Sequence, residues 1–307
     1  MTRSFSDKTL SLVLVISAAA WGLYWYPLRA LEAAGFSGGW SVVFFNACPL
    51  LVLCPWLLLE FRKLRGVLGL TLIVGVVIGL AFTLYANSLV ETTVVRATLL
   101  FYLTPVWSTL IGIFWLAEKL TKARVIAIVV GLIGLFLLLS DGQSSGYPLN
   151  IGDLYGLLSG MFWAVCAGML KRWSGIPVLP LTGFAFVFTT LFSILFAGVV
   201  RAETVPDLAM LMMAFPMTAF WSIGIILPSF IIIFRISQIL FPGRVGILMM
   251  SEVIVAIVSA TLLIPEERML LLQWIGAAAI VAAGLVEVLF GSSKAHAAIA
   301  CADLNRH

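Results

Sequence analysis

The sequence predicts an all-α integral membrane protein with ten transmembrane helices, arranged as two inverted five-helix repeats. Three observations carry this prediction: the composition, the length of the apolar runs and a loose repeat between the two halves. Of the 307 residues, 62% are hydrophobic and 10% are charged, whereas a soluble domain is about 25% charged. Lipid is therefore the expected solvent. Because lipid offers no hydrogen bonds, the backbone must form helices or a closed barrel, and long apolar runs without alternation favour helices.

A membrane-spanning helix needs about 20 consecutive apolar residues at a rise of about 1.5 Å per residue. The first run is longer than the apolar core of a signal peptide and lacks a small-residue cleavage site, so it is expected to remain as a helix. The tail after the last run is polar and is expected to be disordered. The ten predicted spans are residues 9–31, 39–60, 66–89, 93–116, 121–140, 151–172, 178–200, 209–235, 242–264 and 270–290.

Two pairs of segments relate the first half of the chain to the second. The segment SAAAWGLYWYPLRAL aligns with SGMFWAVCAGMLKRW, which places Trp21 on Trp163 at a shift of 142 residues. A second pair places Thr104 on Glu252 at a shift of 148 residues. Since five spans is an odd number, the second copy enters the membrane in the opposite direction, which is typical of alternating-access transporters. The predicted parts are residues 1–145 (first repeat), 146–291 (second repeat) and 292–307 (cytoplasmic tail).

The basic residues predict the orientation. With the N-terminus inside the cell, fourteen of the 18 lysines and arginines fall on the cytoplasmic side. The other four are Arg29, Arg96, Arg201 and Arg268. This bias predicts a multi-pass protein of the bacterial inner membrane with both termini in the cytoplasm. The net charge of +4 then reflects topology, and no nucleic-acid partner is expected.

Cysteine and histidine usage argues against enzymes and metalloproteins. The four cysteines include no closely spaced pair of the kind that binds a metal. Both histidines, His296 and His307, lie in the tail, so none is available within the membrane for a metal, a proton relay or a catalytic triad. We therefore expect no cofactor, no metal and no catalytic residues.

The segment YANSLVETTVVRATLLFYLTPVWSTLIGIFWLAEKLTKARVIAIVVGLIGLFLLL resembles the EamA-type repeat of the drug/metabolite transporter superfamily. The second copy departs from this pattern, because Val253 replaces the proline and Glu252 precedes it. The resemblance implies a ten-helix transporter, similar to bacterial exporters of amino acids and possibly of the YddG type for aromatic amino acids. The features that carry the resemblance are Ala86, Ala97, Pro105 with Val106, Glu118, and Gly131 with Gly134.

Several aromatic residues lie deep within the predicted spans. A tyrosine hydroxyl at this depth needs a partner or water, so these side chains are expected to point into the bundle. Lining a cavity and filling the core remain equal alternatives. Glu252 is costly near the middle of a span unless it is paired or hydrated, and it could hold a substrate ammonium, carry a proton or tie helices together. The expected substrate-binding residues are Trp21, Tyr24, Phe82, Tyr85, Phe101, Tyr102, Thr104, Trp163, Ser251 and Glu252.

The preferred functional prediction is an exporter of amino acids, aromatic or other neutral, and of related small metabolites by alternating access. Its expected partners are a small-molecule substrate and the lipid bilayer, and it is expected to act as a monomer. An exporter of drugs or organic cations is the alternative, since aromatic rings and a carboxylate also suit a cation. A lipid-modifying enzyme would need clustered catalytic groups, and a receptor would not need inverted symmetry. Transport direction and driving force stay open.

Overall fold

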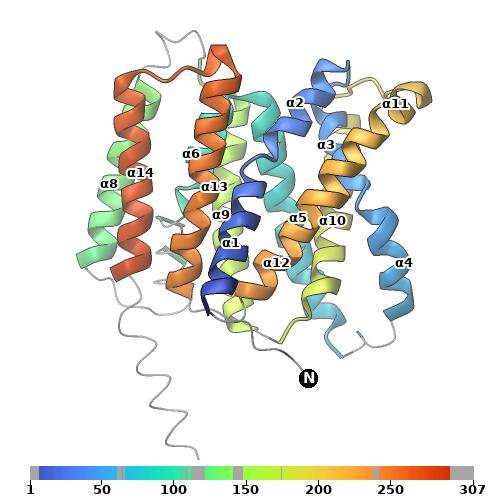
Figure 1. Ribbon diagram of the computed structural model, residues 1–307, viewed down its shortest axis with the longest axis horizontal. Helices are drawn as coiled ribbons and strands as arrows, with labels where there is room; N and C mark the ends of the chain where they lie inside the picture. Colours follow the sequence, from blue (N-terminus) through green and yellow to red (C-terminus); the bar gives the residue numbers. More distant parts are fainter. Residues whose placement is uncertain are drawn as a thin grey trace, which may run out of the picture.

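A computed structural model describes residues 7–60, 64, 66–104, 106–107, 110–111, 122–140, 148–173, 175–237 and 242–290. These residues form helices, turns and loops, with no strand among them. The longer helices run side by side along one common direction (Figure 1). The predicted all-helical architecture is confirmed for this part of the chain.

The first half contains several helices that are shorter than the predicted spans. The first predicted span is broken at residues 22–24, where the Gly22 backbone lies against the Glu252 carbonyl of a later helix. The second is broken near Pro49, where the two helical pieces meet at a bend of 42°. The helices are α1 (Asp7–Trp21), α2 (Trp25–Ala33), α3 (Gly38–Ala47), α4 (Leu50–Glu60), α5 (Leu68–Glu91), α6 (Val94–Phe101) and α8 (Lys122–Ser140).

The second half contains longer helices and two π-helical stretches, η2 and η3. The stretch η3 joins α11 to α12, so that one continuous helical span runs through the predicted eighth span. A π-helical turn often marks a functional region. The elements are α9 (Ile151–Arg172), α10 (Val178–Ile194), η2 (Leu195–Val200), α11 (Leu208–Ala219), η3 (Phe220–Ile226), α12 (Leu227–Ser237), α13 (Pro242–Leu263), the short 3₁₀ turn η4 (Pro265–Glu267) and α14 (Leu271–Phe290).

Within the described residues, five helical spans are long and apolar enough to cross a membrane, or six if the bent pair α3 and α4 forms one span. Three further apolar helices are shorter. The prediction of a multi-pass membrane protein is supported, while the count of ten spans stays a prediction. The predicted disordered tail lies outside the described residues. The five spans are Lys8–Ala33, Leu68–Glu91, Ile151–Leu170, Val178–Val200 and Leu208–Ile236.

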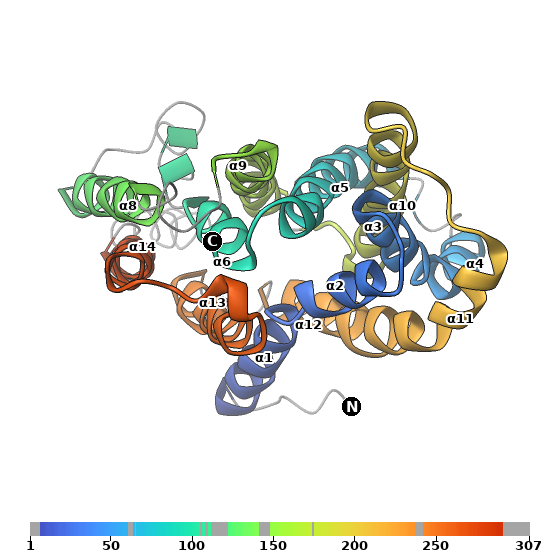
Figure 2. The ribbon, with the colours of Figure 1, turned by 90° about the horizontal axis from the view of Figure 1, so that it is seen from above.

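The most extensive packing joins helices of the first half to helices of the second. α5 packs against α9 and α10, α8 against α14, α1 against α13, and α6 against α9. Figure 2 shows α8 beside α14 at one end of the molecule and α5 beside α9 and α10 farther along. The core therefore lies between the halves, and neither half is a separate globular unit.

Glycine allows close approach in two of these helix pairs, α6 with α9 and α5 with α10. A Cβ atom on Gly160 would overlap the backbone carbonyl of Phe101, and one on Gly79 would lie 2.5 Å from Cβ of Phe188. Small residues are the usual means by which helix backbones come together in lipid, where no hydrophobic effect drives association.

Replacing Gly160 with alanine should therefore destabilise the protein by about 1–3 kcal/mol, the usual cost of overpacking. The matched control is Gly198→Ala, because nothing lies within 4 Å of a Cβ atom at that position. Thermal melts in detergent, followed by intrinsic fluorescence, would compare the two variants. An unchanged melting temperature for Gly160→Ala would show that α6 and α9 can separate at little cost.

Candidate substrate site between the two halves

Seven aromatic residues predicted to bind substrate form one connected set of ring contacts. Trp21 stacks on Tyr24 with ring centroids 4.8 Å apart, and Phe82 stacks on Trp163 at 5.6 Å. Phe101 lies in the fourth predicted span. Its ring contacts those of Tyr85, Tyr102 and Trp163 and so connects this span to the other rings. The structure thus brings together side chains from α1, α5, α6, α9 and the turns that follow α1 and α6. We call the following residues the aromatic cluster: Trp21, Tyr24, Phe82, Tyr85, Phe101, Tyr102, Trp163, Phe230 and Phe234.

The tyrosine hydroxyls of the cluster all have polar neighbours, as their depth predicts. The Asn46 amide donates to the Tyr24 oxygen over 2.9 Å. The Tyr85 hydroxyl lies 3.5 Å from the Thr98 hydroxyl. The prediction that these aromatic side chains point into the bundle is therefore confirmed.

Glu252 lies at the edge of the aromatic cluster and is 1% exposed. The Tyr102 hydroxyl donates a hydrogen bond to Glu252 Oε2 over 2.8 Å. Among the described residues, Glu252 Oε1 has no hydrogen-bond partner. The carboxyl group therefore joins α13 to the end of α6 through Oε2. Its other oxygen, Oε1, is buried without a described hydrogen-bond donor.

Thr104 and Ser251 contact the backbone of neighbouring helices. The Thr104 hydroxyl lies 2.6 Å from the Phe101 carbonyl and 3.4 Å from that of Gly160. The Ser251 hydroxyl lies 2.9 Å from the Leu248 carbonyl and 3.1 Å from that of Val15. Within the described residues, neither hydroxyl has a hydrogen bond to an aromatic side chain of the cluster. Their position is that of residues at helix–helix contacts.

Sequence reasoning missed the contribution of α12. Phe230 contacts Trp21 and Phe82, with ring centroids 4.9 and 4.6 Å apart. Phe234 contacts Trp163 at 6.2 Å. A signal for Phe230 was present, because the shift of 148 residues that aligns Thr104 with Glu252 also aligns Phe82 with Phe230.

The rings of the cluster pack directly on one another. Most are buried, and only Trp163 and Tyr102 are partly exposed. Of the two alternatives that the sequence left open, core filling describes the buried rings of this conformation, including Trp21 and Tyr85.

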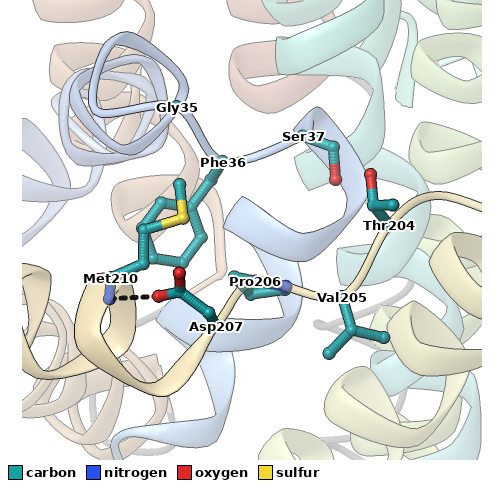
Figure 3. Close-up of a pocket in the computed structure, with 8 residues that line it drawn as sticks. All are labelled: Gly35, Phe36, Ser37, Thr204, Val205, Pro206, Asp207 and Met210. Atoms are coloured by element: carbon teal, nitrogen blue, oxygen red, sulfur yellow. Dashed lines mark hydrogen bonds between the residues drawn. The ribbon is translucent and has the colours of Figure 1, made fainter.

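A separate pocket of about 390 Å³ lies at one end of the bundle, between the loop after α2 and the loop before α11. Figure 3 shows Phe36, Pro206 and Met210 on its walls. Asp207 is the one ionisable residue among its eight lining residues, and its carboxylate accepts from the Met210 N–H over 2.7 Å. The carboxylate is thus used to cap α11, and the pocket is a junction between two loops.

The same end of the bundle carries a network of ion pairs. We call it the paired end, and it contains residues 29–39, 91–96, 148–153, 201–207 and 264–270. Arg201 pairs with Glu91 over 2.7 Å and with Glu203 over 3.4 Å. The Glu203 side chain also accepts from the Gly39 N–H over 3.3 Å. These bonds connect the loop after η2 to the end of α5 and the start of α3.

A second, more buried ion pair stands at the start of α9. Arg96 lies 2.7 Å from Asp153, and the two side chains are 7% and 9% exposed. Asp153 also accepts from the Thr92 hydroxyl over 2.8 Å and, with Asn150, forms a capping box at the N-terminus of α9. Asp153 therefore fastens the beginning of α9 to the loop between α5 and α6.

Glu267 fastens the loop between α13 and α14 to α6. Its two carboxylate oxygens accept from the N–H groups of Val94 and Val95 over 2.9 and 3.2 Å. A negative charge at a helix N-terminus is favourable, but burial raises the pKa of Glu267 above the ordinary value of 4.5 and outweighs the backbone hydrogen bonds, which lower it.

The raised pKa of Glu267 predicts a pH dependence. Because the folded state binds this proton more tightly than the unfolded state, ionisation of Glu267 lowers stability as the pH rises above 4.5 towards the folded-state pKa. The variant Glu267→Gln cannot ionise. Its stability relative to the parent protein should therefore improve between pH 4.5 and neutrality in detergent melts. A constant difference across this range would contradict the assignment.

Comparisons with known proteins agree with this architecture. The sequence profile of the EamA-like transporter family matches residues 9–140. No curated protein matches the chain significantly. The fold is similar to a solved structure described as "Crystal structure of protein", with a TM-score of 0.57 and 18% identity over 92% of this chain and 98% of that one. That likeness concerns the fold alone. Residues 9–140, less than half of the chain, are thus similar to the EamA-like transporter family, and this similarity agrees with a multi-pass membrane protein.

Proposed function

We propose that the chain is an inner-membrane exporter of amino acids, aromatic or other neutral, and of related small metabolites, working by alternating access. The observation that carries this proposal is the aromatic cluster with Glu252, which is buried between helices of both halves. Ligand sites in proteins are mostly apolar with a few polar groups that fix orientation. In transporters built from inverted repeats, such sites lie near the bilayer midplane at the repeat interface.

The packing supports two inverted repeats. If the two halves exchange places, the first predicted span becomes the sixth and the fourth becomes the ninth. The pair α1 and α13 then becomes the pair α9 and α6, and both pairs are in contact. The pair α8 and α14 maps onto itself and is also in contact. Phe82 and Phe230, which correspond at a shift of 148 residues, touch each other.

The ion pairs support a conformation that is closed at the paired end. Three of the four arginines expected outside the cell lie there, each paired with a carboxylate: Arg29 with Glu32, Arg96 with Asp153 and Arg201 with Glu91. In the proposed cycle the outward-open state requires some of these contacts to separate. The buried rings and the ion pairs of the paired end together support our proposal that the site is closed to the outside in this conformation.

Transport by the purified protein in liposomes tests the proposal. A panel of labelled amino acids would be measured with and without a pH gradient, with empty liposomes as the control. We expect saturable movement of at least one aromatic or neutral amino acid or related metabolite above the empty-liposome rate. Rates equal to those of empty liposomes for the entire panel, with correctly folded protein, would contradict the proposed function.

A further inference from the structure

We infer that the site prefers aromatic amines that carry one positive charge, and that Glu252 Oε1 binds their ammonium group. This inference rests on the proposed function, and among the amino acids and related small metabolites named there it favours amines over zwitterionic amino acids. Glu252 is buried, and its Oε2 already accepts from Tyr102, while Oε1 has no hydrogen-bond partner among the described residues. A buried polar atom without a partner is costly. An ammonium group, with its three donors, supplies the missing hydrogen bond.

The surrounding rings suit the same ligand. The Tyr102 hydroxyl donates to the Glu252 carboxyl group over 2.8 Å, so a cation on Oε1 would also lie near an aromatic side chain. The apolar body of the ligand would enter beside Trp163 and Tyr102, which are the partly exposed rings of the cluster. There the aromatic ring of the ligand would take the place of one protein ring in a ring–ring contact.

Charge balance separates amines from amino acids. A zwitterionic amino acid would bring a carboxylate into this site, and a buried carboxylate needs a cationic or strongly donating partner. The ion pairs of Arg29, Arg96 and Arg201 described above lie at the paired end. Within the described residues, no contact places a basic side chain on the aromatic cluster. The single carboxyl group of Glu252 therefore balances one positive charge and leaves a second, negative charge without a partner.

Binding of four probes to the full-length protein in detergent would test the inference at pH 7. The probes are 2-phenylethylamine, L-phenylalanine, 3-phenylpropionate and 2-phenylethanol, which share a phenyl ring and differ in charge. We expect the amine to bind at least tenfold more tightly than each of the other three. The Glu252→Gln variant should lose at least tenfold in amine affinity and keep its affinity for the alcohol.

Two further variants keep the result interpretable. Glu266→Gln removes an exposed carboxylate outside the site and should leave amine affinity unchanged. Tyr102→Phe keeps Glu252 but removes the donor to Oε2, so the ratio of amine to alcohol affinity should rise. This ratio tests the inference even if Glu252→Gln does not fold. A ratio that falls to one in Tyr102→Phe would overturn it.

The outcomes also separate this inference from the proposed function. If L-phenylalanine binds as tightly as the amine and is transported in liposomes, the amine preference is wrong and the amino-acid exporter stands. If amine affinity is equal in Glu252→Gln and the parent protein, the assigned contact is wrong. If folded protein neither binds nor transports any of the four probes or the amino-acid panel, both the inference and the proposed function fail.

Discussion

Replacing Asp153 with alanine should lower the free energy of unfolding by about 3–5 kcal/mol, the usual cost of removing one partner from a buried ion pair. The reason is that the buried guanidinium of Arg96 would lose the carboxylate of Asp153, since both side chains are less than a tenth exposed. The variant also removes the acceptor of the Thr92 hydroxyl and half of the capping box at the start of α9. We expect this to be the largest stability effect of any single polar substitution at the paired end.

Asp207→Ala is the matched control for this prediction. Asp207 also caps a helix N-terminus, through the Met210 N–H, but it is exposed and has no described ion pair. Its loss should cost about 0.5–2 kcal/mol, the ordinary contribution of an N-cap. Denaturant titrations in detergent would measure both variants. Equal losses would mean that the Arg96–Asp153 pair contributes no more than a cap.

Replacing Trp163 with alanine should lower transport at least tenfold while the protein still folds and inserts. Trp163 stacks on Phe82 and contacts Phe101 and Phe234, so it touches α5, α6 and α12 at once. Because it is partly exposed, it is a ring that a ligand can reach. Trp274→Ala is the control, since Trp274 is 41% exposed and lies outside the aromatic cluster. Both variants would be assayed in liposomes at equal protein amount.

If Trp163→Ala transported at the parent rate in a well-folded sample, the ring would belong to the packing core alone. If Trp274→Ala lost as much transport as Trp163→Ala, the effect would report general disturbance of the membrane-embedded protein. The pair of variants therefore distinguishes a substrate site from a structural core, which the sequence left as equal alternatives.

The sequence predicted the helical membrane architecture because composition and run length are local properties that lipid imposes on any spanning segment. It also predicted that Trp21, Tyr85 and Glu252 face inward, because a polar group in lipid must find a partner. It did not predict the break at residues 22–24, which depends on how closely Gly22 approaches α13. Such contacts arise only when distant segments meet.

The partners at the paired end were likewise beyond sequence reasoning. Arg96 pairs with Asp153, and Arg201 pairs with Glu91, across long separations in the chain. The charge bias predicted which end these arginines occupy, but no pattern indicates which carboxylate each one meets. Phe230 is a different case, because its alignment with Phe82 at the repeat shift would have identified it.

Photolabelling tests the central claim, that substrate binds at the aromatic cluster between the halves, most directly. The probes would be 4-azido derivatives of 2-phenylethylamine and of L-phenylalanine, applied to the full-length protein in liposomes and followed by peptide mass spectrometry. We predict adducts on peptides of α1, α5, α9 and α12, concentrated at Trp21, Phe82, Trp163 and Phe230, that unlabelled compound suppresses. Adducts confined to α4 or to other exposed helix faces, or adducts that unlabelled compound leaves unchanged, would contradict it.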